Sequence, residues 1–225
     1  MNDEKRTITY TEIRANEEIR AYIKRADETL LAMGFTEHYF GHVEKCAKIA
    51  GNLLVQLGYD KRTSELARIA AYMHDIGNVV NRSSHAQSGA IMAFEILTRL
   101  GMEAGEIASI VTAIGNHDEG TGFPVNAIAA ALILADKSDV RRTRVRNRDR
   151  SNYDIHDRVN YAVEQSSLNL DAKAKTVTLE LTIDTTISAV MDYFEIFMDR
   201  MLLCRKAAEA LALKFQLHIN GISIL

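Results

Sequence analysis

Helix-breaking residues are rare in this chain, and their scarcity limits its possible folds more than any other feature of the sequence. Pro124 is the one proline among 225 residues, and glycine occurs 12 times. Because proline and glycine end helices and build the turns of β folds, their scarcity favours helices. Apolar residues also recur at a spacing near 3.6 over roughly the first 170 residues, which predicts a series of amphipathic helices joined by short loops.

Seven helices are expected in this region. Thr63 or Ser64 is the expected cap of the third, and Ser84 forms a capping-box pattern with Gln87 for the fourth. Pro124 suits the first turn of the sixth. The expected ranges are 12–33, 39–57, 63–76, 84–100, 103–116, a helix that begins at 124 and continues into an arginine-rich stretch, and 156–167.

The last quarter of the chain has a different pattern. Residues 176–183 alternate between polar and apolar, which predicts a half-buried strand. A long helix with apolar residues at helical spacing follows from Ile187. Residues 215–219 and 222–225 then flank Asn220-Gly221, a strong hairpin signal. These elements predict a small β-α-β-β unit.

The predicted fold class is therefore mainly α, a helical bundle with a small C-terminal β-α-β-β appendage. The expected domain boundary separates residues 1–170 from residues 171–225. A sheet of two or three strands is marginal alone and needs a helix over its apolar face. The apolar stripe of residues 187–201 can cover this sheet or a second copy of the chain, so a homodimer is expected.

Composition excludes several classes of protein. The chain is 47% apolar and 25% charged, as in ordinary globular proteins. Its longest uncharged apolar run, residues 127–135, is far shorter than a membrane span, so no membrane association is expected. The charged segment Met1–Arg6 does not resemble a secretory signal. Cys46 and Cys204 fit buried core positions, which favours a reducing, cytoplasmic location. A net charge of −3 makes nucleic acid an unexpected partner.

Several titratable residues interrupt apolar helix faces. His42 lies on or beside the buried face of the second helix, and the adjacent pair His74-Asp75 lies in the last turn of the third. Asp136 lies within the most apolar helix, where an unpaired carboxylate would be costly. Each residue taken alone could be a hydrogen-bonded core residue, a cap or part of an ion pair. One bound cation accounts for all of them together.

The order H, HD, D resembles the HD superfamily of metal-dependent phosphohydrolases over residues 36–145. The resemblance implies an HD-domain helical bundle and one metal bound by the first set of ligands. In two-metal members, later histidines bind a second metal that the HD aspartate bridges. The implied first set is His42, His74, Asp75 and Asp136, and the implied second set adds His85 and His117 to Asp75.

One or two divalent ions are therefore expected, drawn from Fe, Mn, Co, Ni and Zn, because the ligands are imidazoles and carboxylates. Two metals can hold a bridging hydroxide and neutralise a phosphoryl group. The expected catalytic residues are Asp75, Lys137 as a cationic partner and Asp118 as an orienting group or proton acceptor. The expected phosphate-binding residues are Arg82, Arg141 and Arg142.

Residues 141–150 contain six arginines. This stretch could be a solvated or salt-bridged face, a funnel for anions beside the metals, or a nucleic-acid patch. Guanidinium groups bind phosphate through two hydrogen bonds. Single-stranded nucleic acid would also need aromatic side chains for stacking, and few besides Tyr153 lie nearby. We therefore favour a polyphosphate ligand.

Two branches of the superfamily are similar to this chain. The small bacterial hydrolases of diadenosine tetraphosphate resemble it at His85, His117 and Asp136. The HD-GYP cyclic dinucleotide phosphodiesterases resemble it at residues 120–124, although Phe123 replaces the tyrosine. In both groups a lysine often follows the HD motif, whereas this chain has Asn78, and Arg82 could take its place.

The expected activity is hydrolysis of a phosphate ester or anhydride of a nucleotide-type substrate, such as a dinucleoside polyphosphate. An HD-GYP type phosphodiesterase, a non-catalytic nucleotide-binding regulator and a diiron oxygenase are the competing interpretations.

Overall fold

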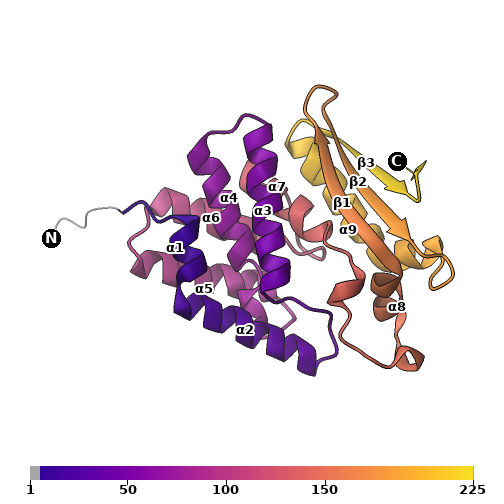
Figure 1. Cartoon of the computed structure of the whole chain (residues 1–225). Coiled ribbons are helices and arrows are strands. Elements are labelled where there is room, and N and C mark those ends of the chain that lie inside the picture. The colour runs from indigo at the N-terminus through magenta and orange to yellow at the C-terminus, as the bar shows by residue number, and fades with distance from the viewer. Residues whose placement is uncertain (1–5, 225) are drawn as a thin grey trace.

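The computed structural model describes residues 6–224. Its N-terminal part is a bundle of helices in which the apolar helix α7 lies next to the C-terminal part (Figure 1). The helices of this bundle are α1 (Tyr10–Ala15), α2 (Glu17–Ala32), α3 (Phe40–Gln56), α4 (Lys61–Met73), α5 (His85–Arg99), α6 (Ala104–Gly115) and α7 (Ala127–Lys137). Three short 3-10 turns interrupt the loops, namely η1 (Ile76–Val79), η2 (Arg142–Arg144) and η3 (Arg150–Asn152).

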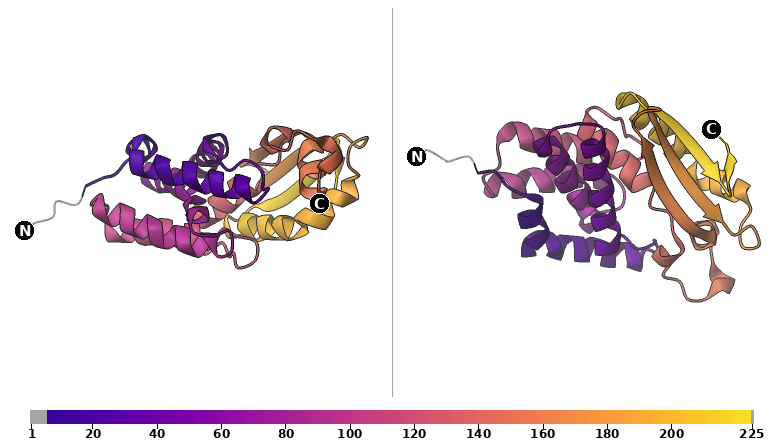
Figure 2. Two further views of the ribbon diagram at one scale, coloured as in Figure 1. Left: turned by 90° about the horizontal axis from the view of Figure 1, so that it is seen from below. Right: turned by 45° about the horizontal axis from the view of Figure 1, so that its top comes forward.

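The C-terminal part is a four-stranded sheet with one long helix packed on it (Figure 2). Its elements are α8 (Ile155–Ala162), β1 (Val163–Asp171), β2 (Thr176–Ile183), α9 (Val190–Ala210), β3 (Lys214–Ile219) and β4 (Ile222–Ser223). The strands lie in the order β1-β2-β3-β4. The β2–β3 pair is parallel and is joined by α9, whereas β1–β2 and β3–β4 are antiparallel.

Helix α7 joins the two parts of the molecule. Nearly every residue of α7 is buried, because the helix packs against α3, α4 and α6 on one side and α9 on the other. An all-round apolar helix is typical of a core element. The carboxylate near its C-terminal end therefore lies at the junction of the bundle and the C-terminal unit.

The mainly helical fold class and the small C-terminal sheet are confirmed. One helix was predicted wrongly. The helix expected over 156–167 ends at Ala162, and Val163–Asp171 forms β1. Leu168 and Leu170 alternate with polar residues, and pairing with β2 supplies this segment with its backbone hydrogen bonds. Such non-local pairing overrides local preference. The boundary expected at residue 170 stays a prediction, although the sheet already begins at Val163.

Several helix ends also differ from expectation. The first helix is divided at Asn16, whose side chain caps α2. Asp60, not Thr63 or Ser64, caps the N-terminus of α4. Ser84 has a φ of 60° and makes no side-chain cap. These differences have one cause. A residue caps a helix only where its own backbone leaves the helical conformation, and the local sequence does not determine that point.

The sixth helix is shorter than predicted. It begins at Ala127, with Asn126 rather than Pro124 at its start, and it ends at Lys137. The arginine-rich stretch that follows is mostly irregular. The hairpin is confirmed, because Asn220 and Gly221 have φ values of 53° and 78°. Leu225, the last residue of the expected final strand, lies outside the described residues.

Within residues 6–224, no helix has both the length and the apolar content that a bilayer crossing requires.

Candidate metal centre and adjoining cavity

The structure brings together all six residues expected to bind metal, although they come from five segments of the bundle. His42 lies on α3, Asp136 on α7 and His85 at the start of α5. All six are buried except Asp136, whose side chain is 12% exposed. Their donor atoms form groups in which every atom lies within 4.8 Å of the others. These groups include His42, His74 and Asp75; Asp75, His85 and His117; and His74, His117 and Asp136.

Gly77 allows the two halves of this centre to approach. A Cβ atom at Gly77 would lie 2.0 Å from the carbonyl oxygen of His85 and 2.4 Å from the amide nitrogen of Gly89. Only a residue without a side chain therefore permits the start of α5 to pack against the turn that follows α4. This contact places His85 Nε2 3.6 Å from Asp75 Oδ1.

The four imidazoles share one orientation. Each Nδ1 atom faces an oxygen that only accepts hydrogen bonds: Asp139 for His42 at 2.8 Å, and backbone carbonyls for His74, His85 and His117 at 2.8, 3.1 and 2.6 Å. Each Nδ1 therefore carries the proton in the neutral ring, and each Nε2 presents a lone pair to the centre. This is the tautomer that a metal-binding histidine adopts.

The polar atoms inside the centre lack partners of their own. His74 Nε2 and Asp75 Oδ2 are buried and make no hydrogen bond. His85 Nε2 and His117 Nε2 lie 3.2 Å apart with a lone pair on each. Buried polar atoms are normally paired, and two facing lone pairs repel. A divalent cation would satisfy these atoms, so the residues present fit the metal that the sequence predicts.

The charges of the centre also favour a cation. Burial opposes a charge on His74, but the carboxylates of Asp75 and Asp136 outweigh burial and raise its pKa. Burial likewise opposes ionisation of Asp75, yet His74 and the other histidines hold the Asp75 pKa well below its usual range. Burial lowers the pKa of His117, and positively charged neighbours lower it further. An ionised Asp75 and a neutral His117 are the forms that bind metal.

Asp139 is a functional candidate that the sequence analysis missed. Its side chain is fully buried, accepts a hydrogen bond from His42, and pairs with Lys45 Nζ at 2.7 Å and Arg141 Nε at 2.9 Å. A carboxylate behind a ligating histidine fixes the orientation of the ring and raises its basicity. The spacing from Asp136 to Asp139, three residues across the end of α7, was the available signal.

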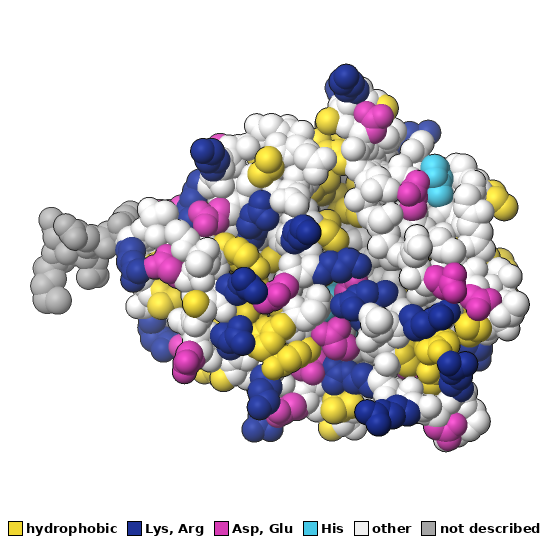
Figure 3. Space-filling view, viewed as in Figure 1, with side chains coloured by type: hydrophobic (Ala, Val, Ile, Leu, Met, Phe, Trp, Pro, Cys, Tyr) yellow, Lys and Arg dark blue, Asp and Glu magenta, His cyan; other side chains and the backbone are white. Residues whose placement is uncertain are grey.

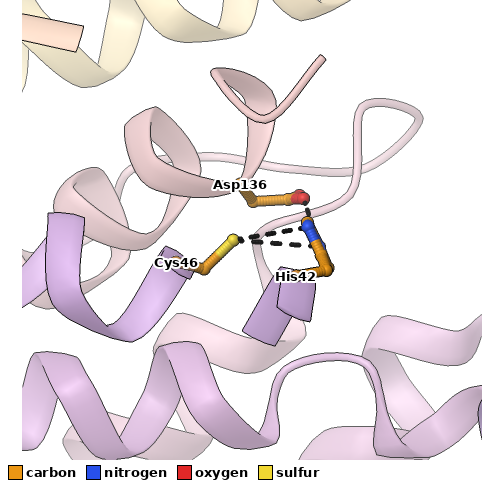
Figure 4. Close-up of side chains that lie close together, drawn as sticks. All are labelled: His42, Cys46 and Asp136. Atoms are coloured by element: carbon orange, nitrogen blue, oxygen red, sulfur yellow. Dashed lines mark hydrogen bonds and ion pairs between the residues drawn. The ribbon is translucent and has the colours of Figure 1, made fainter. Parts of the chain in front are cut away.

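Cys46 also lies beside the centre (Figure 4). Its sulfur is 3.8 Å from His42 Nε2, and His42 Nε2 is 3.3 Å from Asp136 Oδ1. Burial and the nearby carboxylates raise the pKa of the Cys46 thiol well above its usual value. Cys46 Sγ also lies within 4.8 Å of donor atoms of His42 and Asp136, and the buried thiol packs against the His42 ring.

Lys137 belongs to a chain of ion pairs that ends in the C-terminal unit. Its Nζ atom lies 2.6 Å from Asp136 Oδ2 and 3.1 Å from Glu119 Oε2. Glu119 Oε1 lies 2.5 Å from Arg200 Nε on α9. The buried Lys137 ammonium therefore neutralises the part of Asp136 that faces away from the histidines.

Asp118 is less closely placed. Its Oδ1 atom lies 4.0 Å from His85 Nε2, and its side chain is 31% exposed. This position is beside the centre rather than inside it.

A cavity of about 400 Å³ opens beside the centre, between the bundle and the C-terminal unit. Arg82 lies in its wall and close to His85, with Arg82 Nη1 3.5 Å from His85 Nε2. Cavities of this size hold small organic ligands. The other lining residues are Met33, Gly34, Phe35, Thr36, His38, Arg144, Asp154, His156, Asp157, Asn160, Phe197 and Arg200.

Arg141 and Arg142 do not line this cavity. Arg141 pairs with Asp139 and Glu37, and Arg142 Nε donates to the carbonyl oxygen of Tyr161 at 2.7 Å. Lysine and arginine side chains gather with acidic ones over the boundary of the two units (Figure 3). The expectation that Arg141 and Arg142 bind phosphate thus has no support in their position, whereas Arg82 is well placed.

His38 and Arg200 line the cavity and were also missed. His38 lies one helical turn before His42, with their ring centroids 5.4 Å apart, but a loop precedes α3 at this point. Arg200 lies on the polar side of a predicted helix, and nothing in its local sequence distinguishes it from other exposed arginines.

Comparison with known proteins identifies a family that this chain matches. A family model described as the HD domain matches residues 39–195, which include all six candidate ligands. Ribonuclease Y from Cutibacterium acnes (strain DSM 16379 / KPA171202) is 30% identical over 136 residues, 55% of this chain and 24% of that protein. The chain thus spans about a quarter of the length of this curated relative. A crystal structure of a predicted HD superfamily hydrolase from an uncultured Thermotogales bacterium is 24% identical, with a TM-score of 0.44 over 55% of this chain and 67% of that one.

Proposed function

This chain belongs to the HD domain family, and we propose that it is a metal-dependent phosphohydrolase that cleaves a phosphate ester or anhydride of a nucleotide. The observation that carries this proposal is the shared aspartate. Asp75 belongs to the group with His42 and His74 and to the group with His85 and His117. A carboxylate common to two groups of donors suits two neighbouring metal ions.

The bound ions would supply an activated water and neutralise the phosphoryl charge. The protein residues then hold these ligands and the substrate. Asp139 orients His42, and Lys137 holds Asp136. Arg82 lies where it can bind a phosphate oxygen beside His85. Asp118 is the proposed proton acceptor, because it lies near His85 and keeps contact with solvent.

The cavity supports a nucleotide-type substrate such as a dinucleoside polyphosphate. Arg82 and Arg200 are cationic groups suited to phosphates. The ring of Phe35 lines the same cavity and is 39% exposed, so a base could stack on it.

An RNA substrate is the second candidate. It is favoured by the similarity to a protein named ribonuclease Y, which is 30% identical over 136 residues.

The test is metal analysis of the purified chain together with a substrate panel. The panel contains diadenosine tetraphosphate, nucleoside mono- and triphosphates, cyclic dinucleotides and a short single-stranded RNA. We expect phosphate release from a nucleotide with Mn²⁺ or Co²⁺ bound. Turnover of the cyclic dinucleotides alone would favour a phosphodiesterase of the HD-GYP type. Metal binding without turnover on any member of the panel would favour a regulator, and turnover that requires oxygen and iron would favour a diiron oxygenase.

We also propose a homodimer in a reducing, cytoplasmic location. Two free thiols, Cys46 and Cys204, are buried. On α9, Met191 is 74% exposed and Met198 is 47% exposed, and they line an apolar groove with Phe194 and other residues. Light scattering should give twice the chain mass, and Met198→Glu should give the monomer. A monomeric wild-type chain would contradict the dimer.

A further inference from the structure

The cavity beside the metal centre is completed by the C-terminal unit. Arg82 and His38 reach it from the bundle, whereas Phe197 and Arg200 reach it from α9. The HD domain match ends at residue 195, before both of these α9 residues. Phe197 and Arg200 therefore line the cavity from outside the matched range.

Arg200 is held in place by the metal centre itself. Its Nε atom pairs with Glu119, Glu119 also pairs with Lys137, and Lys137 pairs with the candidate ligand Asp136. Helix α9 is fixed at this point because it packs on α7, and a Cβ atom at Gly122 would lie 3.1 Å from Leu203 Cδ2. The position of the guanidinium is thus coupled to the loop that follows His117.

The Arg200 side chain lines the cavity beside Phe197. Its Cζ atom lies 4.3 Å from the centroid of the Phe197 ring, and its side chain is 25% exposed. Among the described residues, Glu119 is its ion-pair partner, through Nε. The terminal nitrogens are thus available to a ligand.

The other cavity arginines differ in this respect. Arg144 donates to the backbone carbonyls of Glu37 and Asp139 at 2.8 and 2.7 Å and is buried. Arg82 makes long contacts with Asn78 at 3.3 Å and His85 at 3.5 Å, its Cζ atom lies 5.4 Å from the centroid of the Phe35 ring, and it retains further donors. Two arginines, Arg82 beside the histidines and Arg200 on the α9 side, can therefore bind phosphates in this cavity.

We propose that Arg200 binds a phosphate group of the substrate other than the one at the metals, so that the C-terminal unit selects substrates with two or more phosphates. Arg82 binds the phosphate nearer to the metals. This inference rests on the proposed function for its substrate class, but the binding step can be measured without turnover.

The test measures binding of methylenediphosphonate, a diphosphate that is not hydrolysed at the bridge, to the full chain as purified. Isothermal titration compares the wild type with Arg200→Gln and with Arg205→Gln, an exposed arginine on the same helix that does not line the cavity. We expect affinity to fall about 10- to 100-fold in Arg200→Gln, as for the loss of a charge-assisted hydrogen bond. Affinity should be unchanged in Arg205→Gln. The affinity for methylphosphonate, which has one phosphorus, should fall by less than about threefold in either variant, because this compound cannot reach both arginines.

Equal affinity of the wild type and Arg200→Gln for methylenediphosphonate would overturn the inference. If Arg200→Gln is unfolded by circular dichroism, Arg200→Lys decides instead. Lysine keeps the charge but not the planar fork, so weaker binding than in Arg205→Lys is expected and equal binding would overturn the inference.

A kinetic comparison separates this inference from the proposed function. On bis(p-nitrophenyl) phosphate, which has one phosphate, KM should change by less than about threefold in Arg200→Gln. On the polyphosphate substrate, its KM should rise about tenfold or more, with metal content unchanged. If the wild type hydrolyses neither compound, the proposed function fails while the binding experiment still decides the role of Arg200.

Discussion

The buried histidines of the bundle and the arginines of residues 141–150 are both dense groups of basic side chains, but their hydrogen bonds are used differently. His42, His74, His85 and His117 bond outward through Nδ1 and leave Nε2 facing inward. In the arginine-rich segment, by contrast, Arg144 is bonded to backbone carbonyls and Arg146 pairs with Asp27. A cluster of imidazole nitrogens and carboxylate oxygens that face one another therefore identifies the site better than the density of charge does.

The largest effect is expected from Asp75→Ala, because this carboxylate is common to both groups of donors. Activity should fall by about a thousandfold or more, since metal catalysis contributes several kcal/mol. Metal content, measured by elemental analysis, should also fall. Asp199→Ala, which removes an exposed carboxylate from α9, is the control and should change neither quantity. Unchanged turnover in Asp75→Ala would contradict the proposed centre.

Asp139→Asn tests whether this carboxylate serves the histidine centre or the arginine-rich segment, because Asp139 bonds to both His42 and Arg141. Loss of an orienting carboxylate typically lowers metal affinity about 10- to 100-fold. Competition with a chelating dye measures this change. Wild-type affinity in the variant would mean that Asp139 serves only the arginine-rich segment.

The same variant should alter the pH dependence of stability. Burial opposes ionisation of Asp139, but His42 and Arg144 outweigh it and hold the Asp139 pKa below its usual value. A depressed pKa stabilises the fold above the unfolded-state value of about 3.9, and this stabilisation is lost as the pH falls below it. Urea unfolding in chelator from about pH 5 to pH 3 should therefore show a steeper loss in the wild type than in Asp139→Asn, by at most about 1.4 kcal/mol per pH unit. Parallel curves would contradict this account.

Smaller effects should distinguish the arginine that is available to a ligand from the arginines that bond to backbone carbonyls. Arg82→Gln should raise KM about tenfold with little change in stability, because Arg82 lines the cavity and its hydrogen bonds with Asn78 and His85 are long. Arg144→Gln should instead lower the free energy of unfolding by about 1–3 kcal/mol, because it leaves buried carbonyls without donors. Arg142→Gln should leave KM unchanged. A raised KM in Arg142→Gln would support the anion-binding role that the sequence suggested for this segment.

Much of the fold followed from local pattern. Helices α3, α5 and α6 lie close to their predicted ranges, because each has a wide apolar stripe and a glycine or polar residue at its end. Strand β1 was missed because only Val163 in it is buried, so its partner strand rather than its own pattern determines its conformation.

His42, the pair His74-Asp75 and Asp136 were predictable because they interrupt apolar helix faces, whereas His85 and His117 were expected from the family resemblance. Their neighbours were not. Asp139 and Arg200 approach the centre through contacts between residues distant in sequence, with His42 and Glu119 as their partners. The partners of Arg141 and Arg142 were likewise not predictable, since Glu37 and the carbonyl oxygen of Tyr161 lie on other segments. Their role in phosphate binding stays a prediction.

The amino-acid sequence alone determined which polar side chains would be buried, because apolar periodicity places His42, His74 and Asp136 on helices whose apolar faces pack in the core. Tertiary structure decided which nitrogen of each imidazole faces the centre and which arginines remain available to a ligand. These properties depend on the oxygen atoms that other segments bring within hydrogen-bonding distance, and hydrogen bonds act over about 3 Å irrespective of separation along the chain.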